Sequence, residues 1–375
     1  MASTKLSTTL SSAPGGPLRR TKAAWAAGVI KQRIKRGVYR AGEQLPSIRS
    51  LCADLGLTLP AVQRAIKQLE VEGVLESQHG VGIRILDSAD CRTTPLIFGF
   101  VQPFFDPFSV SLHYYLEDAL DSRSNLCVIK STRDDPERER QQIEKLVNSG
   151  VNGLLIWPVA GDTNGDFMRE TASRLPVVFV DRTIEGVQAP SVVLAYREFG
   201  RQLVRELCKA GRGRILTVCD PVNISSFNEL KAGLREEAER LQGKCALTIL
   251  DQPLNALIEA SYQGEYDLAD RCYQTLAPLL TSGCYDAVFA PQSQAYDLIF
   301  ARENDPAVLG SLARVSLITS DDHPQPIHYR QLGIESWLAD TSTMMVNALD
   351  LLQDMTLRRT TTARSIRVPF RRAKG

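Results

Sequence analysis

The sequence predicts an α/β protein in which a small unit of helices and a β-hairpin precedes a larger domain of two parallel-sheet lobes. The 375 residues, 43% of them hydrophobic, suffice for one large core and a smaller one. Positive charge gathers in the first 90 residues, which carry 13 Lys and Arg against 7 Asp and Glu, whereas the rest carries 31 against 36. From Pro95 onward, apolar strand-like runs alternate with amphipathic helical segments, which is typical of parallel sheets.

The composition also excludes several classes of protein. Residues 1–18 are rich in Ser, Thr, Pro and Gly without apolar periodicity, so we expect a disordered arm there. The sequence has no signal-peptide core and no run of about 18 apolar residues, which predicts a cytoplasmic protein without a membrane partner. The eight cysteines form no CxxC pair and have no histidine at ligand spacing. They therefore predict free thiols in a reducing compartment, with no metal and no other cofactor.

The first helix is expected over residues 22–37. Ala26, Ile30 and Ile34 fall four residues apart on one apolar stripe, and Gly37 supplies the stop. Basic side chains crowd the last turns of this segment. They either favour the helix C-terminus or contact phosphate, and the pattern does not choose between these two roles.

Two further helices and a hairpin follow. Residues 47–56 predict a helix with Ser47 as its N-cap and Gly56 as its end. A third helix is expected over residues 60–73, with Thr58 as its N-cap. Two strand-like runs then flank a glycine-containing turn, which predicts a hairpin. These runs cover residues 74–77 and 81–86.

The third helix has two different faces. Its apolar side chains recur at helical spacing and predict a buried face. These are Val62, Ala65, Ile66 and Leu69. Gln63, Arg64 and Lys67 fall on the opposite face, and together with Thr58 they are the hydrogen-bond donors that base edges and phosphates require. The alternative for Arg64 and Lys67 is a solvated face without a ligand.

Residues 37–85 resemble the winged helix-turn-helix of the GntR family, through the motifs AGEQLPSIR, TLPAVQRAIKQLEVEG and QHGVG. The resemblance implies binding to double-stranded operator DNA through the third helix, with the hairpin near the minor groove. The residues assigned to DNA are Arg49, Thr58, Gln63, Arg64, Lys67, His79 and Gly80. Leu59 and Pro60 stand where basic or hydroxyl side chains are common in the family, and Gln63 stands where Arg is common, so the operator sequence does not transfer.

The segment after the hairpin divides into a linker and a large domain. The expected organisation is an arm over 1–18, a winged helix-turn-helix over 19–86, a polar linker over 87–95 and a two-lobed domain over 96–372. Residues 95–372 resemble the LacI-type regulator core, which shares the fold of periplasmic sugar-binding proteins. The resemblance rests on the order of FGFVQPFFDPF, GVNGLLIWP, LPVVFVDR, FGRQLVREL, VSLITSDD and SIRVPFRR. It implies a cleft between the lobes and a homodimer formed through them.

Small molecules bind outside the carboxyl ends of the strands in such lobes. The side chains at these ends are aromatic, charged or amide groups, which suit a sugar-like, polyhydroxylated effector. We expect the effector to contact Phe105, Asp106, Trp157, Arg182, Asp220, Gln292 and Asp321. Phe104 and Phe108 are expected to pack in the core instead. Leu230 stands where the family has an arginine and Gln292 where it has an asparagine, so the ligand is an uncommon one or the pocket is degenerate.

Together these features predict a DNA-binding regulator, a repressor whose operator affinity changes when a small molecule binds between the lobes. The alternative is a GntR-headed regulator whose large domain is a degenerate or enzyme-like module used only for dimerisation. We do not expect an enzyme, because four histidines and no Gly-rich phosphate loop followed by Lys give no catalytic constellation. A transport binding protein would need a signal peptide and would carry no winged helix.

Overall fold

The structure is a computed structural model that describes residues 22–35, 37–40, 42–78, 82–86, 95–292, 294–300, 306–320, 331, 333–358 and 364–372. The chain divides between Thr94 and Pro95 into an N-terminal and a C-terminal unit, which we consider separately. The predicted arm and residues 87–94 of the predicted linker lie outside the described residues. None of the described helices is both long and apolar enough to cross a bilayer.

The N-terminal unit contains three helices and a hairpin. In chain order they are α1 (Lys22–Lys35), α2 (Ile48–Leu55), α3 (Leu59–Val71), β1 (Leu75–Gln78) and β2 (Gly82–Ile85). The apolar stripes predicted from the sequence meet in one core, which also takes in the first residue of β1 and the last of β2. Burial of these side chains is the main force that holds helices of this length in place.

Local signals set the ends of the helices as predicted. The Ser47 side chain accepts a hydrogen bond from the Ser50 amide (3.2 Å) and caps α2. Gly56 ends α2 with φ of 63°, a left-handed conformation that costs little only for glycine. Thr58 occupies the N-cap position of α3, but its side chain makes no capping hydrogen bond.

The hairpin is tied to the helical part by a third extended segment. β1 and β2 pair antiparallel, with Leu75 opposite Ile85. The Leu45 amide donates to the Ile83 carbonyl (2.7 Å), and the Ile85 amide donates to the Glu43 carbonyl (2.9 Å). The residues before α2 thus extend the hairpin sheet, and the fold is a winged helix.

Two basic side chains of α1 have partners within the N-terminal unit. Lys31 lies 2.6 Å from Glu72 at the end of α3, and Arg33 pairs with Asp54 of α2. The sequence left two roles open for the basic side chains of α1, namely interaction with the helix C-terminus and contact with phosphate. Lys31 and Arg33 instead form ion pairs that join α1 to the other two helices.

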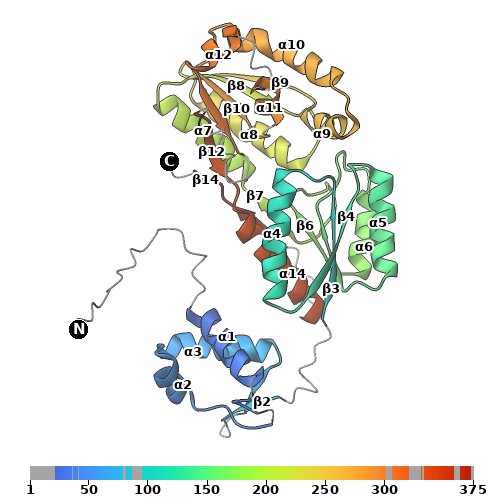
Figure 1. The fold of residues 1–375 in the computed structure, drawn as a ribbon, viewed down its shortest axis with the longest axis vertical. Coiled ribbons are helices and arrows are strands. Elements are labelled where there is room, and N and C mark those ends of the chain that lie inside the picture. Colours follow the sequence, from blue (N-terminus) through green and yellow to red (C-terminus); the bar gives the residue numbers. More distant parts are fainter. Residues whose placement is uncertain are drawn as a thin grey trace, which may run out of the picture. The chain divides into compact units, whose positions relative to one another are not determined.

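The C-terminal unit has two lobes, each built on a six-stranded sheet (Figure 1). Lobe 1 has the all-parallel order β13-β7-β6-β5-β3-β4. Its strands are β3 (Ile97–Gln102), β4 (Leu126–Ser131), β5 (Gly153–Ile156), β6 (Val177–Val180), β7 (Ser191–Leu194) and β13 (Ser365–Val368). Helices α4 (Pro107–Asp121) and α14 (Thr341–Arg358) cover one face, and α5 (Pro136–Asn148) and α6 (Gly165–Arg174) cover the other (Figure 1).

Lobe 2 has the order β14-β12-β11-β10-β8-β9, parallel except for β14. Its strands are β8 (Arg214–Cys219), β9 (Ala246–Asp251), β10 (Ala287–Ala290), β11 (Ser316–Thr319), β12 (Glu335–Leu338) and β14 (Arg371–Arg372). Its helices are α7 (Tyr196–Lys209), α8 (Ser225–Arg240), α9 (Leu254–Gln263), α10 (Asp267–Thr281), α11 (Gln294–Phe300) and α12 (Pro306–Leu312). The chain passes between the lobes three times, after β7, after β12 and after β13, and the predicted two-lobed α/β fold is confirmed.

Helices α7 and α8 approach each other more closely than most helices because each has a glycine at the contact. A Cβ atom on Gly233 would lie 2.0 Å from the Arg197 carbonyl oxygen. A Cβ atom on Gly200 would lie 2.7 Å from the Leu230 carbonyl oxygen. The two backbones are therefore in contact, and no larger residue fits at either position without a shift.

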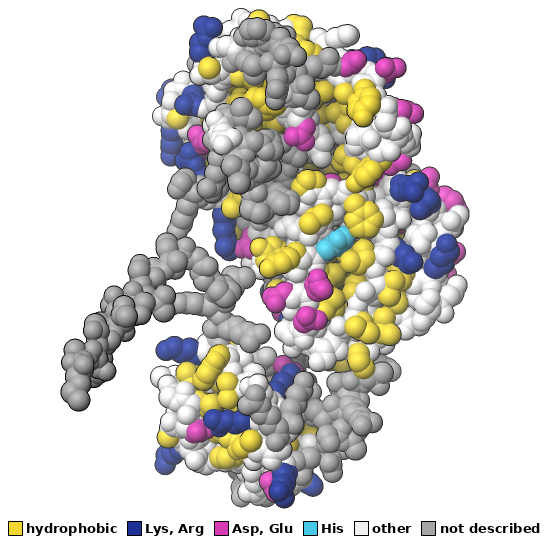
Figure 2. Space-filling model, viewed as in Figure 1, with side chains coloured by type: hydrophobic (Ala, Val, Ile, Leu, Met, Phe, Trp, Pro, Cys, Tyr) yellow, Lys and Arg dark blue, Asp and Glu magenta, His cyan; other side chains and the backbone are white. Residues whose placement is uncertain are grey.

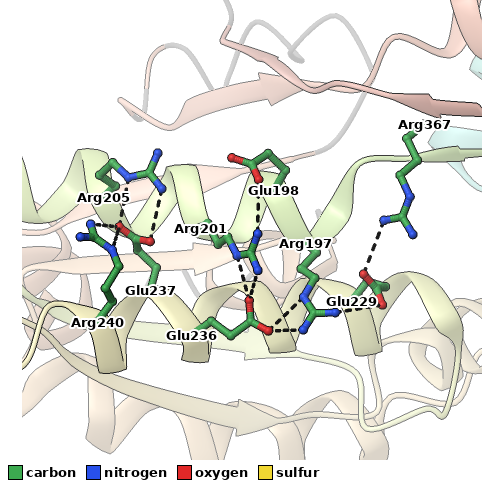
Figure 3. Close-up of polar contacts among 9 residues, drawn as sticks. All are labelled: Arg197, Glu198, Arg201, Arg205, Glu229, Glu236, Glu237, Arg240 and Arg367. Atoms are coloured by element: carbon green, nitrogen blue, oxygen red, sulfur yellow. Dashed lines mark hydrogen bonds and ion pairs between the residues drawn. The ribbon is translucent and has the colours of Figure 1, made fainter.

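Arginines and glutamates fasten the same two helices on their outer side (Figure 3). Arg197 and Arg201 of α7 pair with Glu236 of α8, and Arg205 of α7 pairs with Glu237, which also pairs with Arg240 within α8. Hydrogen bonds from these guanidinium groups lower the pKa of Glu236 and of Glu237 to about 2, so both stay ionised in mild acid. Backbone contact and ion pairs together make α7 and α8 one rigid element.

We expect Gly233→Ala to lower the free energy of unfolding of the C-terminal unit by about 1–3 kcal/mol, because the added methyl group has no space. An ordinary helical Gly→Ala change raises stability by about 0.5–1 kcal/mol. Gly310→Ala in α12 is the matched control, since no atom lies within 4 Å of the Cβ position there. Urea unfolding of both variants measures the difference, and equal shifts would contradict the close contact.

Candidate functional site

The exposed face of α3 carries the side chains that the sequence assigned to DNA. Thr58, Gln63, Arg64 and Lys67 are exposed, while Val62 and its three apolar neighbours on the helix are buried. Arg64 is steadied by a hydrogen bond from its Nε to the Pro60 carbonyl (3.2 Å). This face thus presents donors from a helix that fits the width of a major groove.

Arg49, on α2, is also exposed. Within the described part of the chain, Arg49, Arg64 and Lys67 form no ion pair, unlike Lys31 and Arg33. Their charge is available to an external anion. His79 and Gly80, at the hairpin turn, lie outside the described residues.

The C-terminal unit has a pocket between its lobes, of about 610 Å³ counted to its open mouth. Its lining from lobe 1 and the start of α7 includes Phe104, Asp106, Phe108, Trp157, Asp181, Arg182 and Tyr196. Its lining from lobe 2 includes Ile224, Ser226, Phe227, Asn255, Gln292 and Ser320. The carboxyl ends of both sheets therefore meet at this pocket, as the topology requires.

Four of the seven expected effector contacts line the pocket: Asp106, Trp157, Arg182 and Gln292. Phe105 does not, because the loop after β3 turns it outward, where its ring is 48% exposed and packs against His113. Asp220 does not line it either, because its carboxylate is fully buried and caps backbone amides. Asp321 lies outside the described residues.

An aromatic wall forms one side of the pocket. Phe104 and Phe108 pack edge-on against Trp157, with ring centroids 5.6 and 5.2 Å away. Both phenylalanines pack against the core of the C-terminal unit, as expected, and they line the pocket as well. The loop after β3 and the first turn of α4 direct them toward the other lobe.

Arg182 lies behind this wall with its side chain almost fully buried. Its guanidinium carbon is 5.3 Å from the centroid of the Trp157 ring, and its Nη1 donates to the Pro158 carbonyl (3.1 Å). Nη1 also lies 3.8 Å from a carboxylate oxygen of Asp134. A buried cation is tolerated only with such partners, and here they fix the guanidinium in one position.

Two carboxylates, one buried and one half-buried, hold the loop that follows β5. Glu139 accepts hydrogen bonds from the Val159 amide (2.9 Å) and the Asn164 side chain (2.7 Å). Asp134 accepts one from the Ala160 amide (3.1 Å). Burial raises the pKa of both carboxyl groups. The loop that carries Trp157 is thus anchored from behind.

Asp181 and Tyr196 were not singled out from the sequence, although both line the pocket. Asp181 has φ of 62°, and the Arg182 amide donates to the Val180 carbonyl across it (2.7 Å), so the chain turns sharply at the end of β6. The Tyr196 hydroxyl donates to the Asp181 carboxylate (2.6 Å). Burial raises the pKa of Asp181, while the charge of Arg182 acts in the opposite direction. The sequence feature that could have identified Asp181 was its position as an acidic residue directly before Arg182.

Lobe 2 contributes a pair of amides. The Gln292 amide group donates to the Asn255 side-chain oxygen (2.6 Å). The other amide atoms, Gln292 Oε1 and Asn255 Nδ2, are buried and find no partner among the described residues, and the same holds for Arg182 Nε. Turning both amides round would again leave one donor and one acceptor free. Unpaired buried polar atoms are costly, so their gathering at one pocket indicates a ligand with hydroxyl groups.

Asp220 and Leu230 have supporting positions. The Asp220 carboxylate accepts a hydrogen bond from the backbone amide of Asn255 (2.7 Å) and so places Asn255 at the pocket. Leu230 lies in the core, and α8 reaches the pocket one turn earlier, through Ser226 and Phe227. At position 230, where the resemblance implied a pocket arginine, this chain therefore has a core side chain.

Comparison with known families agrees with both units. Residues 98–311 match the family described as periplasmic binding protein domain, and residues 23–85 match that of bacterial regulatory proteins, gntR family. The first match covers more than half of the chain. The chain belongs to the periplasmic binding protein domain family and carries a GntR-type domain at its N-terminus. Both resemblances stated from the sequence are confirmed.

Curated proteins similar to this chain include transcriptional regulators. The HTH-type transcriptional regulator PtxS of Pseudomonas plecoglossicida is 29% identical over 227 residues, which cover 60% of each chain. The arabinose metabolism transcriptional repressor of Geobacillus stearothermophilus is 22% identical over 211 residues, covering 54% of this chain and 57% of the repressor. The matched region thus spans less than two thirds of either relative.

Solved structures of this fold include regulators and transport proteins. The Cra regulator of Pseudomonas putida, solved with fructose 1-phosphate, has a TM-score of 0.56 at 19% identity and covers 74% of this chain and 98% of its own. A solute binding protein of Burkholderia graminis, solved with D-arabinose, has a TM-score of 0.63 at 13% identity and covers 75% of this chain and 95% of its own. At these identities the likeness shows the periplasmic-binding-protein fold alone.

Proposed function

We propose that this protein is a DNA-binding transcriptional regulator, a repressor that responds to a sugar-like ligand in the interlobe pocket. The observation that carries the proposal is the pocket itself, where an aromatic wall faces unpaired amide atoms. Aromatic faces cover the C–H groups of a sugar, and amides pair with its hydroxyls. The GntR-type unit adds an exposed, cationic helix face to the same chain.

The alternative, a degenerate domain used only for dimerisation, gains no support from the pocket. A pocket that has lost its ligand would be expected to lose its unpaired polar atoms as well, since each has a cost in stability. Arg182, Asn255 and Gln292 retain theirs. The names of the relatives describe regulators, which favours binding over catalysis.

A homodimer is part of the proposal, because a two-fold pair of winged helices matches an inverted-repeat operator. An apolar band on lobe 1 supports it, and hydrophobic side chains gather on this face in Figure 2. The band comprises Val110 and Tyr114 on α4 and Leu126 and Val128 on β4, between 39 and 69% exposed. β4 is an edge strand of its sheet, and natural proteins rarely leave an apolar edge uncovered.

The DNA proposal is tested by selecting bound sequences from a random pool and then measuring salt dependence on the enriched site. We expect Lys67→Ala to reduce the slope of log Kd against log salt by about 0.9, the contribution of one phosphate contact. Lys209→Ala, which removes an exposed lysine from the C-terminal unit, is the control and should leave the slope unchanged. If selection enriches no inverted repeat, the proposal of sequence-specific DNA binding is wrong.

The ligand proposal is tested by thermal shift of the full chain against neutral monosaccharides, polyols, sugar acids and sugar phosphates. For any compound that stabilises the protein, we expect Gln292→Ala to weaken binding tenfold or more by calorimetry, or about 1.4 kcal/mol. Gln263→Ala is the control, because this exposed side chain is the last residue of α9 and donates to Glu259 on the same helix. Equal affinity in both variants would place the ligand elsewhere, and binding without a change in operator affinity would refute the regulatory role.

The dimer proposal is tested by sedimentation. Tyr114→Glu places a charge in the apolar band and should raise the dimer dissociation constant by tenfold or more, since an unpaired carboxylate is costly to bury. Tyr262 is 74% exposed but lies on α9 in lobe 2, so Tyr262→Glu is the matched control. A chain that sediments as a monomer before any substitution would end the dimer proposal.

A further inference from the structure

The two lobes also bind each other directly, beside the pocket. The Thr183 amide, after β6, donates to the Ser225 hydroxyl at the start of α8 (2.8 Å). The Gly161 amide, in the loop after β5, donates to the Asn223 carbonyl (3.2 Å). Two separate loops of lobe 1 thus meet one short segment of lobe 2. We call these four residues the interlobe latch.

A small apolar cluster surrounds the latch. Ile224 and Phe227 of lobe 2 are at least 92% buried, and Ala160 of lobe 1 packs against the cluster that they form with Cys219. Asn223 is steadied by a hydrogen bond from the Asn228 side chain (2.7 Å). The Thr183–Ser225 bond is half-buried beside these apolar groups and so competes less with water, whereas Gly161 and Asn223 are exposed.

In each lobe, one latch residue is the direct chain neighbour of a residue that lines the pocket. Thr183 follows Arg182, and Ser225 precedes Ser226, and both of these neighbours line the pocket. Ser225 and Thr183 do not line it themselves. The donor loop that contains Gly161 is fixed from behind by Asp134 and Glu139. A change in the distance between the lobes would therefore break both latch bonds together.

A third contact between the lobes is weaker. Arg367 of β13 lies 3.6 Å from Glu229 of α8, but these side chains are 59% and 38% exposed. Ion pairs so exposed to solvent contribute little. The hydrogen bond from Tyr196 of α7 to Asp181, at the pocket, also joins the lobes.

We infer that the interlobe latch stabilises the closed arrangement of the lobes, and that Ser225 is a positioning residue that sets ligand affinity without contacting the ligand. The regulatory consequence rests on the proposed function, whereas closure by the latch does not. Because the latch contributes part of the free energy of closure, a ligand that binds the closed arrangement has to supply only the remainder. A weaker latch raises the ligand concentration needed for response.

The test is hydrogen–deuterium exchange and small-angle X-ray scattering on the full chain without ligand or DNA. In Ser225→Ala we expect the Gly161 amide to exchange roughly tenfold faster, although its own acceptor is unchanged, and the radius of gyration to increase. Ser261→Ala is the control, because that hydroxyl bonds only to the Ile258 carbonyl within α9. Ser225→Thr keeps the hydroxyl and should restore slow exchange at Gly161.

Faster exchange confined to the Thr183 amide, with Gly161 and the scattering unchanged, would overturn the inference. Alanine suits the first position of a helix, so we expect Ser225→Ala to fold. Ser225→Cys, with a weaker acceptor of similar size, is measured in parallel and must shift Gly161 in the same direction. Because neither ligand nor DNA is present, failure of the latch and failure of the proposed function give different results.

Discussion

The pocket of this protein depends on one buried cation. Arg182 is almost without water, and its charge is compensated by Asp134, by a backbone carbonyl and by the faces of Trp157 and Phe104. A guanidinium in this position forces its neighbours to take fixed places, since each partner that it loses would leave a buried charge exposed to an apolar medium. The position of the aromatic wall follows from that requirement, as does the use of Asp134 to hold the next loop.

Most of the fold was predictable from periodicity. The strands that flank the pocket are uninterrupted apolar runs, as central parallel strands must be, and the helices between them carry clear apolar stripes. β12 is harder to recognise, because only Trp337 and Leu338 of its four residues are apolar. α14 was missed because its apolar residues nearly surround the helix, as befits a segment packed on a sheet and on α4.

The site was predictable where it follows strands and unpredictable where it depends on contact between the lobes. Trp157, Arg182 and Gln292 stand at carboxyl ends, which topology alone brings together. Asn255 and Tyr196 come from helix starts, and only the three-dimensional arrangement places them at the pocket. Phe105 and Asp220 also follow strands, but neither lines the pocket. A loop after a strand does not keep the strand's alternation of sides, so the strand pattern does not predict where its side chains point.

The threading of the chain through lobe 1 has a consequence for synthesis on the ribosome. Lobe 1 receives its sixth strand, β13, and its covering helix, α14, from residues 341–368, after the whole of β8 to β12. Until that segment emerges, Leu155, Val178 and Val180 lack part of the cover that α14 gives them, and the sheet presents an apolar face to solvent. Lobe 2, by contrast, gains its tightest helix contact from the continuous segment 196–240. The half of the domain that is translated first is therefore completed only near the end of the chain, and its nascent form suits a chaperone that binds exposed apolar surface.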